Sequence, residues 1–108
     1  MDNIPYLPAY EVLSAQCAVW CPYCGIFHYH ARAADPQRAM CKNGRGQYIV
    51  VPTGKPFTDE MRRADRLGQT HFSRYQNCYA HPSRFKFIPY PTPAGCEPLN
   101  MPDVGCKQ

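Results

Sequence analysis

The sequence predicts a small α+β domain of zinc-ribbon-like β-hairpins, with one short helix and extended, Pro-rich termini. Three observations lead to this prediction. The chain has 108 residues, about the length of one domain. Its twelve prolines require much turn and extended backbone. Its seven cysteines and four histidines are candidate metal ligands. A domain this small has a limited core and often needs a bound metal ion for stability.

The first elements are an extended arm and a β-hairpin. Residues 1–11 hold two prolines and two tyrosines and predict the arm. Residues 12–20 mix Val, Leu, Ala and Trp and predict a short strand. The aromatic run 26–30 alternates, which favours a second strand. Together the two strands predict a hairpin with Cys21 and Cys24 at its tip.

A second hairpin is expected over residues 37–51. Asn43-Gly44-Arg45-Gly46 is a strong turn signal, because Asn and Gly tolerate positive φ. The run 47–51 is rich in β-branched residues and is the best strand candidate, with Pro52 as its end.

One helix of about ten residues follows. Thr58 is a good N-cap residue, and Gly68 suits the position just past the helix end. An apolar stripe of Met61, Ala64 and Leu67 would face the core.

The remainder predicts a strand and a tail. Residues 84–88 alternate and predict a strand with its two phenylalanines inward. From residue 89 the prolines suit polyproline II or coil. The predicted organisation is therefore an arm (1–11), a zinc-stabilised α+β domain (12–88) and a Pro-rich tail (89–108).

The strongest motif is Cys21-x2-Cys24, followed by Gly25. Two thiolates at this spacing can bind one ion across a tight turn, and a closed structural zinc site needs four ligands. Cys41 is the leading third ligand, and His30 is the predicted fourth, with His28 as the alternative on the same strand face. Cys41 could instead be a small buried apolar residue, and His30 could merely cap a strand.

A second metal site is a weaker possibility. Cys78-x2-His81 has ligand-like spacing, and Cys96 and Cys106 could complete the set and hold the tail on the domain.

Two further chemistries are disfavoured. Trp20-Cys21-Pro22-Tyr23-Cys24 is similar to the redox motif of thioredoxins and glutaredoxins, but that motif opens a helix, and here an aromatic strand follows. The sequence offers no deaminase pattern, nucleophile constellation or phosphate-binding loop. We therefore expect no enzyme and no small-molecule substrate.

The segment from Trp20 to about Gly54 resembles small uncharacterised zinc-finger-like proteins of actinobacteria and their phages. The residues that carry the resemblance are Cys21-Pro22-Tyr23-Cys24, His28-x-His30, Gln37-Arg38-Ala39-x-Cys41 and Gly46-x-Tyr48-Ile49-Val50-x-Pro52-x-Gly54. Gln37 and Met40 depart from it, because that family tends to have histidine at both positions. Their loss favours Cys41 with His28 or His30 as ligands. The family brings no known activity.

The charge distribution suits an anionic partner. The net charge is +4, but residues 32–86 carry eleven Lys and Arg against four acidic residues, a net +7. Such a field can attract nucleic acid. A solvated mixed-charge surface explains the pattern slightly better, because the basic residues form no run. The candidate nucleic-acid contacts are Arg62, Arg63, Arg66, Arg74, Arg84 and Lys86.

The alternative function is a protein-interaction module of a phage or mobile element. It would dock through the Tyr- and Pro-rich arms on a virion, an assembly or a host complex, as an anti-CRISPR-type inhibitor would. No stretch of about 20 apolar residues is present to span a membrane. The start of the chain has no signal-peptide pattern, so the expected compartment is the cytoplasm, or the virion for a phage protein.

Overall fold

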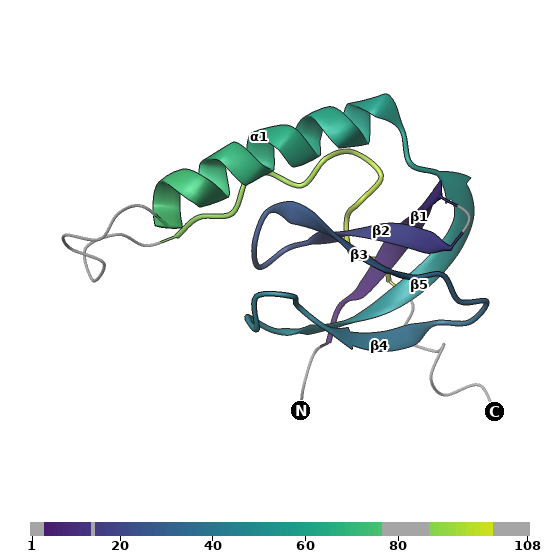
Figure 1. Cartoon of the computed structure of the whole chain (residues 1–108). Coiled ribbons are helices and arrows are strands. Elements are labelled where there is room, and N and C mark those ends of the chain that lie inside the picture. Colours follow the sequence, from purple (N-terminus) through teal and green to yellow (C-terminus); the bar gives the residue numbers. More distant parts are fainter. Residues whose placement is uncertain (1–3, 14, 77–86, 101–108) are drawn as a thin grey trace.

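The computed structural model describes residues 4–13, 15–76 and 87–100, which form a five-stranded sheet and one helix (Figure 1). The elements in chain order are β1 (Tyr6–Leu13), β2 (Gln16–Cys21), β3 (Ile26–Ala31), β4 (Gln37–Met40), β5 (Gln47–Pro56) and α1 (Asp59–Gln76). The predicted α+β class is confirmed. No helix in the described part of the chain is long and apolar enough to cross a membrane.

The sheet is mixed and curled, with the strand order β3-β2-β1-β5-β4. Both predicted hairpins are present: β2 pairs antiparallel with β3, and β4 pairs antiparallel with β5. Two predicted bounds are wrong, because β2 begins only at Gln16 and β5 continues past Pro52 to Pro56. The two hairpins meet through β1, which is antiparallel to β2 and parallel to β5. The outermost strands are therefore β3 and β4. Because the sheet curls, these two strands lie on either side of its concave face (Figure 1).

The extended arm that the sequence predicts over residues 1–11 is instead part of the sheet from Tyr6 onward. Residues 6–13 form β1, the central strand of the sheet. Leu7 and Ala9 are each only 1% exposed, so burial of these side chains outweighs the N–H donor that Pro8 lacks. Pro5 still contributes through its carbonyl oxygen, which accepts a hydrogen bond of 2.8 Å from the Ile49 N–H.

The core is divided between the two faces of the sheet, because successive side chains of a strand point to opposite sides. On β2, Cys17, Val19 and Cys21 belong to one buried cluster, while Ala18 and Trp20 belong to another. We call the first the inner face, around which the sheet curls, and the second the outer face. Helix α1 packs on the outer face through Met61 and Ala64.

Helix α1 begins as predicted but runs much farther. The Thr58 hydroxyl accepts a hydrogen bond of 3.1 Å from the Met61 N–H, as an N-cap residue does. Gly68 does not end the helix, which continues to Gln76, and Leu67 is 48% exposed instead of facing the core. Gly68 is buried, and a Cβ there would lie 2.0 Å from the Gly25 carbonyl oxygen. This glycine therefore permits close packing of α1 on the 21–25 turn.

An aspartate ties α1 to the edge of the sheet. The Asp65 carboxylate accepts a hydrogen bond of 2.9 Å from the Phe27 N–H of β3. The Tyr29 hydroxyl donates to the same carboxylate at 3.4 Å. The helix thus covers one edge of the sheet, which would otherwise offer unpaired backbone groups.

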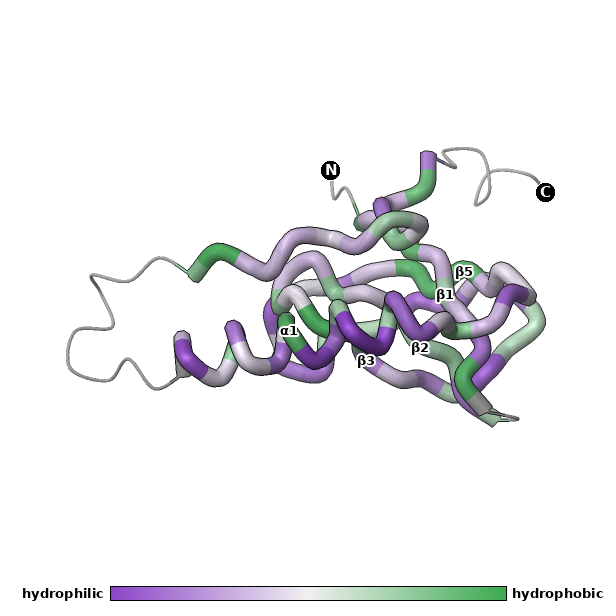
Figure 2. The backbone as a smooth tube through the Cα atoms, turned by 90° about the horizontal axis from the view of Figure 1, so that it is seen from above, coloured by the Kyte–Doolittle hydropathy of each residue, from purple (hydrophilic) through white to green (hydrophobic). Residues whose placement is uncertain are grey.

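The described part of the C-terminal segment packs on the domain. Residues 87–100 run beside α1 and then past the sheet (Figures 1 and 2). The Leu99 N–H donates a hydrogen bond of 2.7 Å to the Tyr6 carbonyl oxygen, and Cys96 is 1% exposed on the outer face. Residues 87 and 88 are not in a strand, and the rest of the predicted 84–88 strand lies outside the described residues.

Candidate metal centre

The first half of the centre is the turn between β2 and β3. The Gly25 N–H donates a hydrogen bond of 2.8 Å to the Cys21 carbonyl oxygen, and the Cys24 N–H donates to the same oxygen at 3.3 Å. Gly25 has a φ of 73°, a conformation that glycine adopts without steric cost. This tight turn brings the Cys21 and Cys24 thiols to the same side, where both are fully buried.

The second half is the turn between β4 and β5. Cys41 opens it, and its N–H donates a hydrogen bond of 2.7 Å to the Gly46 carbonyl oxygen. Gly44, with a φ of 71°, stands where a Cys-x2-Cys turn would have its second cysteine. This turn therefore supplies one thiol, and a fourth ligand must come from another element.

The fourth group is the His28 imidazole of β3. The ligand atoms of Cys21, Cys24, His28 and Cys41 all lie within 4.8 Å of one another. The Cys41 Sγ is 3.6 Å from the Cys21 Sγ, 3.4 Å from the Cys24 Sγ and 3.4 Å from the His28 Nε2. Ligands around a tetrahedral zinc lie about 3.8 Å apart, since a Zn–S bond is about 2.3 Å. The four groups therefore fit one metal ion.

The predicted choice between the two histidines is corrected. His30 lies one pleat farther from the turns, and its Nε2 is 2.7 Å from the Tyr48 hydroxyl oxygen. His28 pairs with Val19 of the neighbouring strand β2. It is only 5% exposed and lies beside the thiols. Both histidines share a strand face, as expected, but only the one nearer the hairpin tip reaches the cysteines.

The electrostatics of the four groups suit a cation. Burial and the neighbouring Cys24 and Cys41 raise the pKa of the Cys21 thiol. Burial lowers the pKa of His28 to about 4, which keeps the imidazole neutral and able to ligate. Three thiolates in this buried cluster would be destabilised by the loss of hydration and by mutual repulsion, unless a bound cation offsets their charge.

Hydrogen bonds to sulfur compensate part of this cost. Burial raises the pKa of Cys41, but the backbone N–H groups of Arg45 and Asn43, with the Cys24 and Cys21 thiols, outweigh it and lower the pKa overall. Asn43 also donates from its side-chain Nδ2 to the Cys24 Sγ at 3.2 Å. The sequence identified Asn43 as a turn residue only. Its place two residues after a ligand was the available signal for a contact with sulfur.

The surrounding elements enclose the two turns. A Cβ on Gly25 would lie 2.3 Å from the Tyr90 backbone nitrogen, so the C-terminal segment contacts the first turn, which also contacts Gly68 of α1. Tyr23 crosses to the second turn, where its hydroxyl donates a hydrogen bond of 2.8 Å to the Gln47 carbonyl oxygen. Helix, tail and both hairpins thus meet at the candidate centre.

The second predicted site is not assembled by the residues that the structure describes. Cys96 lies on the outer face with Tyr10 and Trp20, on the opposite side of the sheet from the candidate centre. Its three proposed partners, Cys78, His81 and Cys106, lie outside the described ranges. Within those ranges, the one group of three or more cysteine, histidine or acidic ligands close enough to hold an ion is the cluster above.

Four of the six residues that the sequence predicts as nucleic-acid contacts lie in the described part of the chain. Arg62, Arg63, Arg66 and Arg74 are all exposed residues of α1. Arg84 and Lys86 lie outside the described residues. A basic residue that the sequence did not single out, Arg45, packs its guanidinium 4.9 Å from the Phe72 ring centre and 4.8 Å from that of Phe87.

Replacement of each histidine tests the choice of ligand. We expect His28→Ala to lower metal affinity by about 100-fold or more, because one of four ligands is lost. His30→Phe should leave metal affinity within a few-fold, because it keeps the ring and loses only the Tyr48 hydrogen bond. Competition titration with a chromophoric zinc chelator measures both. Equal losses in the two variants would contradict the choice of His28.

The chain matches no protein-family model, no curated protein and no solved structure. The description of this site therefore rests on its own geometry and donor chemistry.

Proposed function

We propose that the chain is a non-enzymatic zinc-binding module that binds nucleic acid through the exposed face of α1. The observation that supports the zinc is the buried set of three thiols and one imidazole, at mutual distances suited to a tetrahedron. Sulfur and nitrogen ligands in such a geometry favour zinc over magnesium or calcium, which prefer oxygen.

The role we assign to the zinc is structural. Four protein ligands fill a tetrahedral shell, whereas a catalytic zinc keeps a position open for water or substrate. All four ligand residues are at most 5% exposed, and the ion would join the two hairpins at their tips. The resemblance to zinc-finger-like proteins of actinobacteria and their phages agrees with such a role, and membership of that group is part of the proposal.

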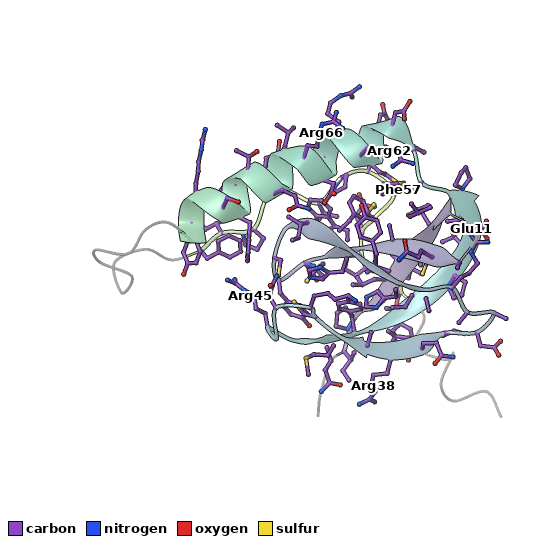
Figure 3. The ribbon with its side chains drawn as sticks, viewed as in Figure 1. Glu11, Arg38, Arg45, Phe57, Arg62 and Arg66 are labelled. Atoms are coloured by element: carbon purple, nitrogen blue, oxygen red, sulfur yellow. The ribbon has the colours of Figure 1, made fainter. Side chains whose placement is uncertain are left out.

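The nucleic-acid proposal rests on the arginines of α1. Arg62, Arg63 and Arg66 lie within about one helical turn, and Arg74 lies two turns beyond Arg66. Figure 2 shows that most of this helix is hydrophilic, and Arg66 points away from the sheet in Figure 3. Phosphate groups along about 18 Å could meet this row, because a helix rises 1.5 Å per residue.

Intramolecular contacts leave the Arg62 side chain largely exposed. Arg62 lies 3.9 Å from the Asp59 carboxylate and 4.9 Å from the Phe57 ring centre. Its side chain is nevertheless 47% exposed, and exposed pairs of this kind contribute little. The aromatic rings near the end of α1, by contrast, already pack with Arg45. The proposal therefore depends on phosphate contacts more than on base stacking.

Replacing Arg62, Arg63 and Arg66 together by alanine tests the proposed surface. The affinity for a single-stranded oligonucleotide should fall, and the slope of log K against log salt should flatten by about 2, since each phosphate contact contributes about 0.7. Fluorescence anisotropy across a salt series measures both. A triple variant with Lys42, Lys55 and Arg38 replaced controls for net charge. If both variants weaken binding equally, α1 is not the contact surface.

A protein partner is the second candidate, favoured by exposed apolar residues beside the arginines. Leu67 is 48% exposed and Ile88 is 69% exposed. The His71 Nε2 lies 2.7 Å from the Ile88 carbonyl oxygen, which places Ile88 beside the C-terminal half of α1. The Tyr- and Pro-rich segments are less suited to docking than expected, because their described parts pack on the domain. A wild-type chain without salt-dependent oligonucleotide binding would favour this candidate.

A further inference from the structure

The inner face of the sheet has two unlike halves. The half nearest the two turns holds the metal cluster and is filled by Leu7, Val19 and Tyr48, each at most 1% exposed. The other half contains a pocket of about 790 Å³, a volume typical of small-molecule sites. It opens beside the connection between β3 and β4.

Small side chains create this pocket. The inward positions of its strands are occupied by Ala9 on β1, Cys17 on β2, Ala39 on β4 and Val50 on β5. The connection after β3 continues the pattern with two more alanines, at positions 33 and 34. A curled sheet needs large inward side chains to fill its interior. This half lacks them, so an apolar space is left.

One polar pair lies at the boundary of the two halves. The Tyr48 hydroxyl belongs to the filled half, and its oxygen is 2.7 Å from the Nε2 of His30, which lines the pocket. The half-buried imidazole is thereby held in place by a buried tyrosine. It gives the small apolar side chains of the interior one oriented ring that can hydrogen-bond. The other uncharged polar side chains of the lining are Gln37 and Thr53, and the Thr53 hydroxyl already donates a hydrogen bond of 2.7 Å to the Ala9 carbonyl oxygen.

The charges at the mouth are mixed. Arg32 and Glu11 both line the pocket and form an ion pair of 3.8 Å. Asp35 and Arg38 add one charge of each sign to the lining. The mouth therefore presents no excess of either sign, and a charged ligand would lose hydration without gaining a dedicated partner.

We propose that this pocket binds an uncharged, largely apolar small molecule that carries one hydrogen-bonding group, which His30 contacts. The site is separate from the zinc and from the arginines of α1. It also differs from the expectation drawn from the sequence, which suggested no small-molecule site because no local motif marks it. The lining comes from five strands and two connections that only the fold brings together.

The probe for the experiment is 2-naphthol, which is uncharged, aromatic and carries one hydroxyl group. Titrated into the zinc-loaded, ¹⁵N-labelled full chain, it should cause saturable shifts of the amide signals of Ala9, Ala31, Ala39 and Val50. The affinity should fall at least tenfold in Ala39→Leu, which fills the interior, and in Ala34→Trp, which narrows the mouth from an exposed position. Leu67→Ala, outside the pocket, is the matched control and should bind as the wild type does.

Two comparisons test the ligand class. His30→Phe should weaken 2-naphthol about fivefold, the value of one ordinary hydrogen bond. The anion 2-naphthoate should bind at least tenfold more weakly than 2-naphthol. Absence of saturable shifts in the wild type, or wild-type affinity in both Ala39→Leu and Ala34→Trp with zinc and fold retained, would overturn the pocket. Unchanged affinity in His30→Phe, or tighter binding of 2-naphthoate, would overturn the assigned chemistry.

Discussion

Cys24→Ser is expected to leave the chain without its metal and without a stable fold. Cys24 is fully buried, and its Sγ lies 3.4 Å from the Cys41 Sγ. Zinc-finger peptides gain an apparent 10–16 kcal/mol from structural zinc at neutral pH, whereas a whole domain is stable by about 5–15 kcal/mol. Loss of one ligand can therefore remove most of the stability. Thermal unfolding followed by circular dichroism, together with the zinc content per chain, measures the effect.

The control for that experiment is Cys17→Ser. Cys17 is also buried on β2, but it belongs to the opposite half of the inner face, and its Sγ lies 3.9 Å from the Ala31 carbonyl oxygen. This variant should keep one zinc per chain. Its free energy of unfolding should fall only modestly, because Cys17 contributes to the core as a small buried apolar residue. A Cys24→Ser protein that unfolds at the same temperature as Cys17→Ser, with its zinc intact, would rule out the cluster as a structural centre.

Gly68→Ala is expected to destabilise the domain by about 2 kcal/mol, although alanine is the better helix former. In an exposed helix this change usually stabilises by about 1 kcal/mol. Here the new Cβ would lie 2.0 Å from the Gly25 carbonyl oxygen and 3.2 Å from the Ile26 Cγ2. The backbone of α1 must move away from the first turn, and overpacking of this kind costs roughly 1–3 kcal/mol. The melting temperature should fall by roughly 10 °C.

Ser73→Ala is the matched control within the same helix. Ser73 is exposed, so its replacement tests helix propensity without the steric contact, and a change within about 0.5 kcal/mol is expected. A Gly68→Ala variant that is as stable as Ser73→Ala would mean that α1 does not pack closely on the turn.

The hairpins and three cysteines of the cluster could be predicted because their signals are local. Cys21 and Cys24 form one turn by themselves, and the Asn43-Gly44 pair places Cys41 at the start of another. The choice of His28 could not be predicted in the same way. Two histidines on one strand face differ only in their distance from the hairpin tip. Which of them lies near Cys41 depends on how β4 and β5 pack against β3, and the sequence does not show this.

The errors at β1 and α1 have one physical cause. Pro5 and Pro8 are local signals for an extended arm, and Gly68 is a local signal for a helix end. In the fold, both segments are determined by tertiary packing. β1 pairs with β2 and β5 and buries Leu7 and Ala9 on the inner face, and Gly68 lies against a carbonyl group. Local propensity is a weak guide wherever a segment contacts others that are distant in the chain.

The central position of β1 also constrains the order in which the molecule can fold during synthesis. Tyr6 leaves the ribosome early, yet its parallel partner Ile49 follows only after both cysteine turns have been made. Long-range parallel pairing is slow, while hairpins close in microseconds. The two hairpins can therefore gather the metal ligands first, and the captured ion would hold them side by side until β1 joins them. If the cluster binds zinc as proposed, the yield of folded protein is expected to depend on the metal supply during translation.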